Sequence, residues 1–130
     1  MSAKDHRELR VYQLAFESAV RIYEFTKTFP AEERFSLTDQ VRRSSRSVCA
    51  NIAEAWRKRR YPKSFVSKLS DADAEATETV VWLDFALRFS YLSVELHQEL
   101  INNYDHICRQ LAVMMAQPEK WIPRNVERGE

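Results

Sequence analysis

Nine of the twenty lysines and arginines in this 130-residue chain lie between Gln40 and Lys68, and Glu54 is the one acid among them. The next stretch has the opposite sign, because Asp71 to Asp105 holds eight acids and a single Lys or Arg, Arg88. Like charges gathered on one surface attract polyanions and steer their approach, whereas an evenly mixed surface does not. The formal net charge of +1 therefore conceals a candidate nucleic-acid surface.

The elements that position these charges are predicted to be helices. The chain has one glycine, Gly129, so it can hardly make the tight turns that β-hairpins need. Apolar residues recur at three- and four-residue spacing in four segments, and all four prolines fall between or beyond these segments. We expect helices from Glu8 to Thr28, from Leu37 to just before Pro62, from Pro62 to about residue 89, and from an N-cap at Ser93 to Pro118.

Long helices joined by short connections favour an antiparallel up-and-down four-helix bundle, which makes the predicted fold class all-α. A chain of this length fits one domain, which we place at residues 1–121, with a flexible C-terminal tail at residues 122–130. The longest purely apolar run, Val80 to Leu83, is too short to span a bilayer, and the N-terminus lacks the apolar core of a signal peptide. We expect a soluble cytoplasmic protein without membrane contact, whose Cys49 and Cys108 are reduced, packed thiols.

Four arginines of the basic stretch share one helical face. At 100° per residue, they would form a stripe about 27 Å long if the second helix continues unbroken to position 60. Three further bases flank the far end of this stripe. Such a surface contacts phosphates, and the predicted nucleic-acid-binding residues are Arg42, Arg46, Arg57, Lys58, Arg59, Arg60 and Lys63.

A structural interpretation competes with this one. Arg42 or Arg43 could pair with Glu75 or Glu78 of the third helix, within one subunit or between subunits, although exposed pairs contribute only about 0–1 kcal/mol each. The run from Arg57 to Arg60 is the better candidate for a partner, because four adjacent charges point in all directions around a helix.

A polar face accompanies the apolar stripe of the second helix. Gln40, Ser47, Asn51 and Glu54 follow one another at intervals of seven, four and three residues. They form either a polar site or, as we favour, hydrogen-bonded neighbours that fix helix packing or subunit register.

Catalytic and metal-binding patterns are missing from the sequence. His6, His97 and His106 are scattered, and no Glu-x-x-His pair of the carboxylate-bundle type occurs. The serines of the second helix have no histidine near them in sequence, and no phosphate-cradling loop is available without glycines. We predict no enzyme activity, no cofactor and no metal. The aromatics are predicted to be core, with Trp56 and Tyr61 as candidates to stack on unpaired bases.

The central part of the chain resembles the signature of a known family. The segment FPAEERFSLTDQVRRSSRSVCANIAEA, residues 29–55, resembles the signature of bacterial four-helix bundle proteins called S23 ribosomal proteins, which are encoded within intervening sequences of large-subunit ribosomal RNA genes, among other places. The matching positions are Phe29, Pro30, Glu33, Leu37, Gln40, Arg42, Arg43, Ser47 and residues 51–54, with Leu9, Val11, Tyr12 and Ala15 in the first helix.

Two positions depart from that signature. Ala55 replaces its usual glycine, and Cys49 replaces a proline that is common inside the second helix. Both changes favour a more regular helix, so we expect Trp56 and the bases beyond it to continue the helix for a turn.

The resemblance implies a ring-like homopentamer. A related family, the accessory proteins of diversity-generating retroelements, uses a similar bundle to bind nucleic acid beside a reverse transcriptase. Our prediction is a non-catalytic, homo-oligomeric protein that binds RNA or DNA through non-specific phosphate contacts. The alternative is a scaffold whose charged faces mediate self-assembly or bind a protein partner such as a reverse transcriptase.

Overall fold

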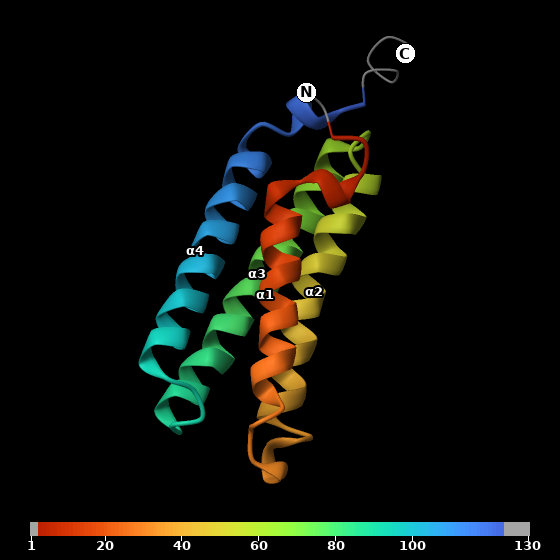
Figure 1. Cartoon of the computed structure of the whole chain (residues 1–130). Coiled ribbons are helices and arrows are strands. Elements are labelled where there is room, and N and C mark those ends of the chain that lie inside the picture. The colour runs from red at the N-terminus through yellow and green to blue at the C-terminus, as the bar shows by residue number, and fades with distance from the viewer. Residues whose placement is uncertain (1–2, 124–130) are drawn as a thin grey trace.

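The computed structural model describes residues 3–123, and within them it contains four α-helices and no strand. The helices are α1 (Arg10–Thr26), α2 (Leu37–Arg57), α3 (Pro62–Arg88) and α4 (Val94–Ala116). They run alternately up and down beside one another (Figure 1). The prediction of an all-α four-helix bundle is confirmed. Of the predicted tail, residues 122–130, the structure describes residues 122 and 123, and residues 124–130 lie outside the described residues.

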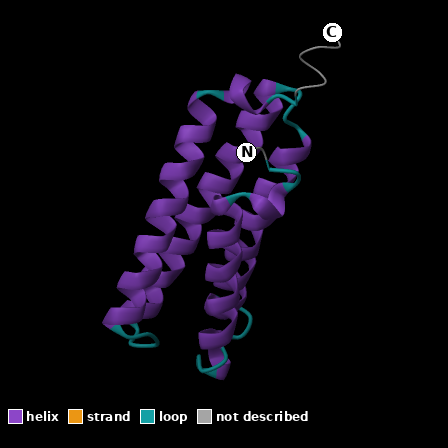
Figure 2. Ribbon diagram, turned by 45° about the horizontal axis from the view of Figure 1, so that its top comes forward, coloured by secondary structure: helices purple, strands orange, loops and turns teal. Residues whose placement is uncertain are grey.

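Three short 3₁₀ turns flank the helices: η1 (His6–Glu8), η2 (Ala31–Glu33) and η3 (Pro118–Trp121). The loops between the α-helices are short and lie at the two ends of the bundle (Figure 2). At one end α2 finishes beside the start of α1, the end of α4 and η3; the α1–α2 and α3–α4 connections lie at the other end (Figure 1). The basic residues at the end of α2 thus lie near both ends of the described chain.

Local chemistry explains most helix boundaries. Ser93 caps α4 as predicted, since its hydroxyl accepts a hydrogen bond from the Leu96 backbone N–H at 3.1 Å. Pro62 occupies the first turn of α3, where its missing N–H removes no helical bond. Asp5 caps only η1, and the extended backbone of Leu9 separates that turn from α1, which begins at Arg10 rather than Glu8.

The chain reverses between α3 and α4 without a glycine. Ser90 takes φ 63°, the left-handed conformation that glycine usually adopts at this position after a helix. The Tyr91 backbone N–H then donates to the carbonyl of Ala86 at 2.9 Å, which closes the end of α3. A serine therefore supplies the left-handed residue of the short connection that the sequence predicted here.

The core is one cluster to which all four helices contribute. Ile22 of α1, Ile52 of α2, Leu69 of α3 and Tyr104 of α4 are fully buried in it. A buried polar contact joins α2 and α3, because the hydroxyls of Ser44 on α2 and Thr79 on α3 lie 2.8 Å apart. This core fixes which face of α2 points outward.

Candidate nucleic-acid interface

The last turn of α2 ends earlier than the sequence suggested. The helix includes Trp56 and Arg57, but Lys58 leaves helical geometry and the Tyr61 N–H donates to the Lys58 carbonyl at 2.9 Å in a following turn. Tyr61, the residue before Pro62, has extended backbone geometry, which separates α2 from α3. Arg60 is therefore outside the helix, and the continuous stripe from Arg42 to Arg60 is a prediction that was wrong.

Ion pairing separates the basic residues into two kinds. Of the nine bases between Gln40 and Lys68, two form salt bridges within residues 3–123: Arg43 with Asp39 at 4.0 Å and Lys68 with Glu54 at 2.7 Å. The other seven have no acidic partner there, and they are the seven residues predicted to bind nucleic acid. The predicted pairing of Arg42 or Arg43 with Glu75 or Glu78 is not formed inside one subunit.

Four of these seven bases are exposed around the junction of α2 and α3: Arg57, Lys58, Arg60 and Lys63. We call them the bundle-end cluster. Each exposes its cationic head to water without a salt bridge inside residues 3–123, which is the state in which a phosphate can replace a counterion.

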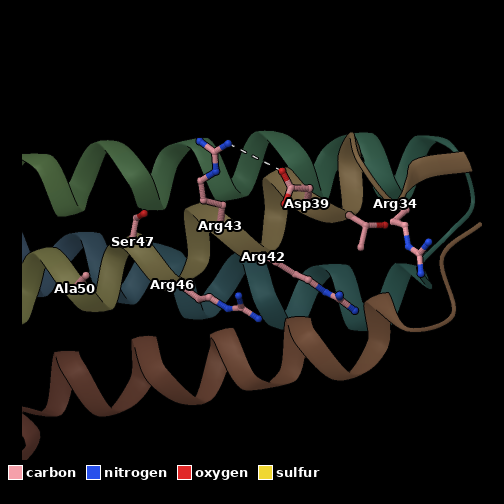
Figure 3. A pocket seen from close by; sticks show the side chains of 8 residues that line it. Arg34, Asp39, Arg42, Arg43, Arg46, Ser47 and Ala50 are labelled. Atoms are coloured by element: carbon pink, nitrogen blue, oxygen red, sulfur yellow. Dashed lines mark ion pairs between the residues drawn. The ribbon is translucent and has the colours of Figure 1, made fainter. Parts of the chain in front are cut away.

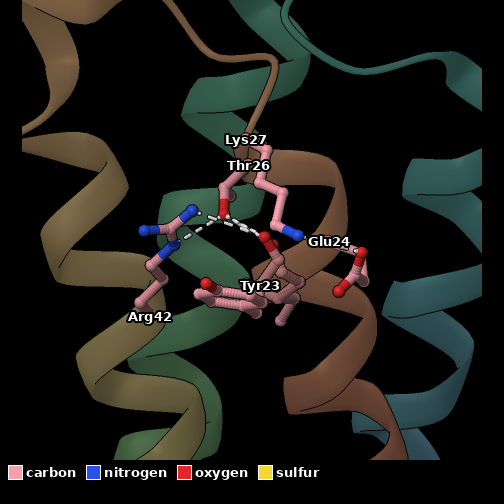
Figure 4. A network of polar contacts seen from close by, with 6 residues as sticks. Tyr23, Glu24, Thr26, Lys27 and Arg42 are labelled. Atoms are coloured by element: carbon pink, nitrogen blue, oxygen red, sulfur yellow. Dashed lines mark hydrogen bonds and ion pairs between the residues drawn. The ribbon is translucent and has the colours of Figure 1, made fainter.

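Arg42, by contrast, is held inside the fold. Its Nε donates to the Thr26 hydroxyl at 2.8 Å, and its guanidinium carbon lies 4.6 Å from the centroid of the Tyr23 ring. Figure 4 shows the guanidinium beside Tyr23 and Thr26 at the end of α1. Arg42 therefore links α2 to α1, and only part of its guanidinium is accessible to a partner.

A second basic surface lies along the first half of α2. It is a shallow pocket of about 400 Å³ lined by Arg34, Arg42, Arg43 and Arg46, with Asp39 as the acid among its lining residues. Arg42 and Arg46 extend toward α1, whereas Arg43 extends toward α3 (Figure 3). Sequence reasoning missed Arg34, although its place in the loop just before a basic helix was a usable signal.

The pocket and the bundle-end cluster are separate surfaces. Arg46 and Arg57 are eleven residues apart, which is about 16 Å along a helix axis. No base lies between them on α2. A polyanion would therefore contact two basic regions rather than one continuous stripe.

Arg59 and Trp56 form a packed pair at the end of α2. Trp56 is buried, and the Arg59 guanidinium covers its ring. Partial burial, together with the positive charge of Arg57, lowers the pKa of Arg59. Trp56 is thus not open to a stacking base, whereas the other predicted aromatic, Tyr61, is 56% exposed.

The predicted polar face of α2 is occupied by helix contacts. The Asn51 side-chain amide donates to the Ser47 carbonyl at 2.9 Å, and Glu54 reaches across to Lys68 of α3. The Glu54 carboxylate raises the pKa of Lys68. Gln40 is half-buried on the same helix. Of these contacts only the Glu54–Lys68 pair links α2 to another helix, so the packing role of the whole face stays a prediction.

The acids of α3 repel one another. Partial burial, followed by the carboxylate of Glu78, raises the pKa of Glu75, and Arg43 opposes this more weakly. Arg43 is thus near enough to influence Glu75 without forming a salt bridge. The carboxylates of Glu75 and Glu78 therefore remain available to a basic partner.

Neither cysteine has a reactive environment. Burial raises the pKa of Cys49 to about 11, and burial together with Asp73 raises the pKa of Cys108 to about 12. Among residues 3–123 no group of three or more His, Cys, Asp or Glu side chains is arranged to hold a metal ion. No helix in that range is long and apolar enough to cross a membrane.

The fold and this surface define a class: a small antiparallel helical bundle whose second helix and the turn after it carry Lys and Arg side chains without salt-bridge partners in residues 3–123. A family model described as 23S rRNA-intervening sequence protein matches residues 7–113, and the chain belongs to that family, as its central motif indicated. No curated protein matches the chain.

A solved structure supports the same assignment. It is a protein with unknown function from the S23 ribosomal protein family of Bacteroides thetaiotaomicron. The two chains are 32% identical, the match covers 82% of this chain and 95% of that one, and the TM-score is 0.74. The similarity to retroelement accessory proteins stays a prediction.

Proposed function

We propose that this protein binds the phosphate backbone of RNA or DNA without catalysing a reaction, and that the bundle-end cluster supplies the main contacts. The observation that carries the proposal is that seven of the nine bases between Gln40 and Lys68 lack an acidic partner within residues 3–123. Binding a phosphate there breaks no internal ion pair and releases counterions. The family name makes RNA the first polyanion to test.

The arginine pocket on α2 supplies a secondary contact. Arg46 and Arg34 are both exposed and both line this pocket. Because Arg42 is partly buried and Arg43 is paired with Asp39, this pocket contributes less free charge than the bundle-end cluster. The proposed mechanism is neutralisation of phosphates, with no base read.

The experiment measures affinity for a single-stranded RNA and a duplex DNA across a salt series. One variant carries Arg57→Ala, Lys58→Ala and Arg60→Ala. The matched control carries Arg7→Ala, Arg21→Ala and Lys27→Ala, which removes the same charge from bases that are paired with Asp5, Glu99 and Glu24.

We expect the first variant to flatten the dependence of log affinity on log salt by about 2 to 3 units and the control to leave it nearly unchanged. Absence of polyanion binding by the unmodified protein at low salt would refute the proposal. So would equal losses in the two variants, because only net charge would then matter.

A second candidate function is self-assembly, and a specific observation favours it. Phe16, Val20 and Tyr23 of α1 are 47%, 43% and 40% exposed, and they line a groove of about 560 Å³ between α1 and α2. Val81, Phe85 and Phe89 of α3 are exposed to a similar degree. Exposed apolar faces of this kind mark interaction sites.

These faces are where a homopentamer, or a scaffold that recruits a protein such as a reverse transcriptase, would make contacts. Light scattering on Phe16→Glu and Phe85→Glu tests the assembly, since a charge in a buried interface should lower the particle mass. Reversing Arg57, Lys58 and Arg60 to glutamate separates the candidates. Loss of the oligomer in that variant would favour the scaffold, whereas an intact oligomer without polyanion affinity would favour nucleic-acid binding.

A further inference from the structure

A large pocket occupies the end of the bundle, where α1 begins and where α2 and α4 finish. It has a volume of about 1110 Å³, which is enough for a ligand larger than one nucleotide. Leu9, Val113 and Met114 form part of its apolar wall, and η3 closes one side with Trp121. Ile122 and Pro123, which the sequence placed in a flexible tail, are half-buried and also line it. We call this the bundle-end pocket.

Two aromatic rings in this pocket are open to a ligand, the exposed imidazole of His106 and the larger indole of Trp121. Trp121 is half-buried and packs against Trp56 and Phe65, with ring centroids 6.5 and 6.3 Å apart. Trp56 also lines the pocket, but Arg59 covers it. The exposed part of Trp121 is therefore the larger aromatic surface on which a flat ligand would rest.

The charge around the bundle-end pocket selects an anion. Arg10, Arg59 and Lys120 line it and have no salt-bridge partner within residues 3–123, while Arg109 is paired with Asp105 at 3.1 Å. Glu8 is the single acid among the lining residues. An aromatic, apolar wall with unpaired cations suits a ligand that joins a flat ring to a phosphate.

The pocket adjoins the bundle-end cluster in the chain. Arg59 lines the pocket, its immediate neighbours in the chain are Lys58 and Arg60, and Arg57 lies two residues before it. A strand whose phosphates cross the cluster would reach the pocket without leaving the protein surface. The pocket and the cluster are thus near enough in the chain for one strand to contact both.

We infer that the bundle-end pocket takes an unpaired nucleobase of a bound strand, which stacks on Trp121 while its phosphate contacts Arg10, Arg59 or Lys120. This inference rests on the proposed function and makes it specific, because a blunt duplex keeps its bases stacked and paired and cannot fill the pocket. The protein would consequently prefer single-stranded nucleic acid or unpaired ends over duplex.

The test compares binding of an oligoadenylate, an abasic oligonucleotide of the same length and a blunt RNA duplex. In the charge-neutral variant Trp121→Ala, oligoadenylate affinity should fall by about 5- to 100-fold, while duplex and abasic affinities stay as they were. Because Trp121 packs on two core aromatics, a second variant is needed to separate loss of the stacking surface from loss of folding. Val113→Glu places a carboxylate in the pocket at a position that is 71% exposed.

Its matched control is Val94→Glu, on the same helix, 66% exposed and at the opposite end of the bundle. We expect Val113→Glu to weaken oligoadenylate binding more than duplex binding and Val94→Glu to affect both little. The inference would be overturned if Trp121→Ala changed single-strand and duplex affinities alike, or if the unmodified protein bound the abasic strand as tightly as oligoadenylate. It would also be overturned if Val113→Glu lowered only the oligomer mass, which would assign the pocket to a second copy of the chain.

These outcomes stand apart from failure of the proposed function. If the bundle-end cluster binds phosphates but the pocket takes no base, the salt dependence still flattens in the Arg57, Lys58 and Arg60 variant, and only the strand preference is missing. If the proposed function itself fails, the unmodified protein binds none of the three nucleic acids at low salt.

Discussion

The guanidinium carbon of Arg59 lies 3.6 Å from the centroid of the Trp56 ring, and the Arg59 Nε donates a hydrogen bond to the Trp56 carbonyl at 2.8 Å. A planar guanidinium can stack on an indole while it closes the end of a helix, whereas a lysine ammonium cannot do both. Arg59 therefore stabilises the end of α2 in addition to carrying charge.

Arg59→Lys should lower the free energy of unfolding by about 0.5–2 kcal/mol, because it keeps the charge but loses the stacking and the Nε hydrogen bond. Urea unfolding measures the loss. Arg60→Lys is the control, since the Arg60 guanidinium carbon is 5.8 Å from the Tyr61 ring and both residues are exposed. Equal stability of the two variants would show that the stacking contributes nothing.

Arg42 and Arg46 are one helical turn apart, and we expect them to respond differently to truncation. Arg42→Ala should cost about 1–3 kcal/mol of stability, because it removes the hydrogen bond to Thr26 and the contact with the Tyr23 ring. Arg46→Ala should cost less than about 0.5 kcal/mol, since this side chain is exposed and lies 5.9 Å from the same ring. Denaturant unfolding measures both stability losses, and a larger loss for Arg46→Ala than for Arg42→Ala would contradict this prediction.

The contrast between Arg42 and Arg46 shows what the sequence could and could not reveal. The periodicity of apolar residues and the positions of Pro62 and Ser93 predicted all four helices, because local chemistry determines those features. The contact of Arg42 with Thr26 spans sixteen residues of sequence, so it depends on how α1 docks on α2. That Arg42 is held therefore follows from tertiary packing, whereas the Arg43–Asp39 and Arg59–Trp56 contacts are local in sequence.

The end of α2 and the bundle-end pocket were missed for related reasons. Nothing between Arg57 and Tyr61 marks a helix end, since neither glycine nor proline occurs there; the helix stops because the chain must reverse before α3. The pocket combines residues from both ends of the described chain, including Leu9 and Trp121, and no spacing rule connects residues so far apart.

The buried hydroxyl pair between α2 and α3 gives a test of packing that is independent of nucleic acid. Ser44 and Thr79 are 2% and 0% exposed, and without Thr79 the Ser44 hydroxyl keeps only a 3.4 Å contact to the Val41 carbonyl. Thr79→Val should therefore cost about 1–3 kcal/mol through an unsatisfied buried hydroxyl. Urea unfolding of Thr79→Val gives this value.

The double variant Ser44→Ala, Thr79→Val removes both hydroxyls. It should be more stable than the sum of the two single losses predicts, because no polar group is then left unpaired. Additive losses would mean that the two hydroxyls do not interact across the helix interface.

Glu75 predicts how stability depends on pH. Its pKa lies above the ordinary value of 4.5 in the folded protein, first because of partial burial and then because of the Glu78 carboxylate. The unfolded chain therefore loses this proton at lower pH than the folded chain does. Between the two pKa values the folded state binds more protons, so this residue lowers stability as pH rises through that window, and the loss remains at neutral pH.

Glu75→Gln removes the titration, and the variant should exceed the unmodified protein in melting temperature at about pH 7, with the difference vanishing below the ordinary pKa as Glu75 becomes protonated. Glu17→Gln on α1, where the side chain is exposed, serves as the control for loss of one negative charge. A melting temperature that falls in Glu75→Gln at neutral pH would mean that the attraction of Arg43 outweighs burial and the repulsion of Glu78, and that the acidic face of α3 is held by α2 after all.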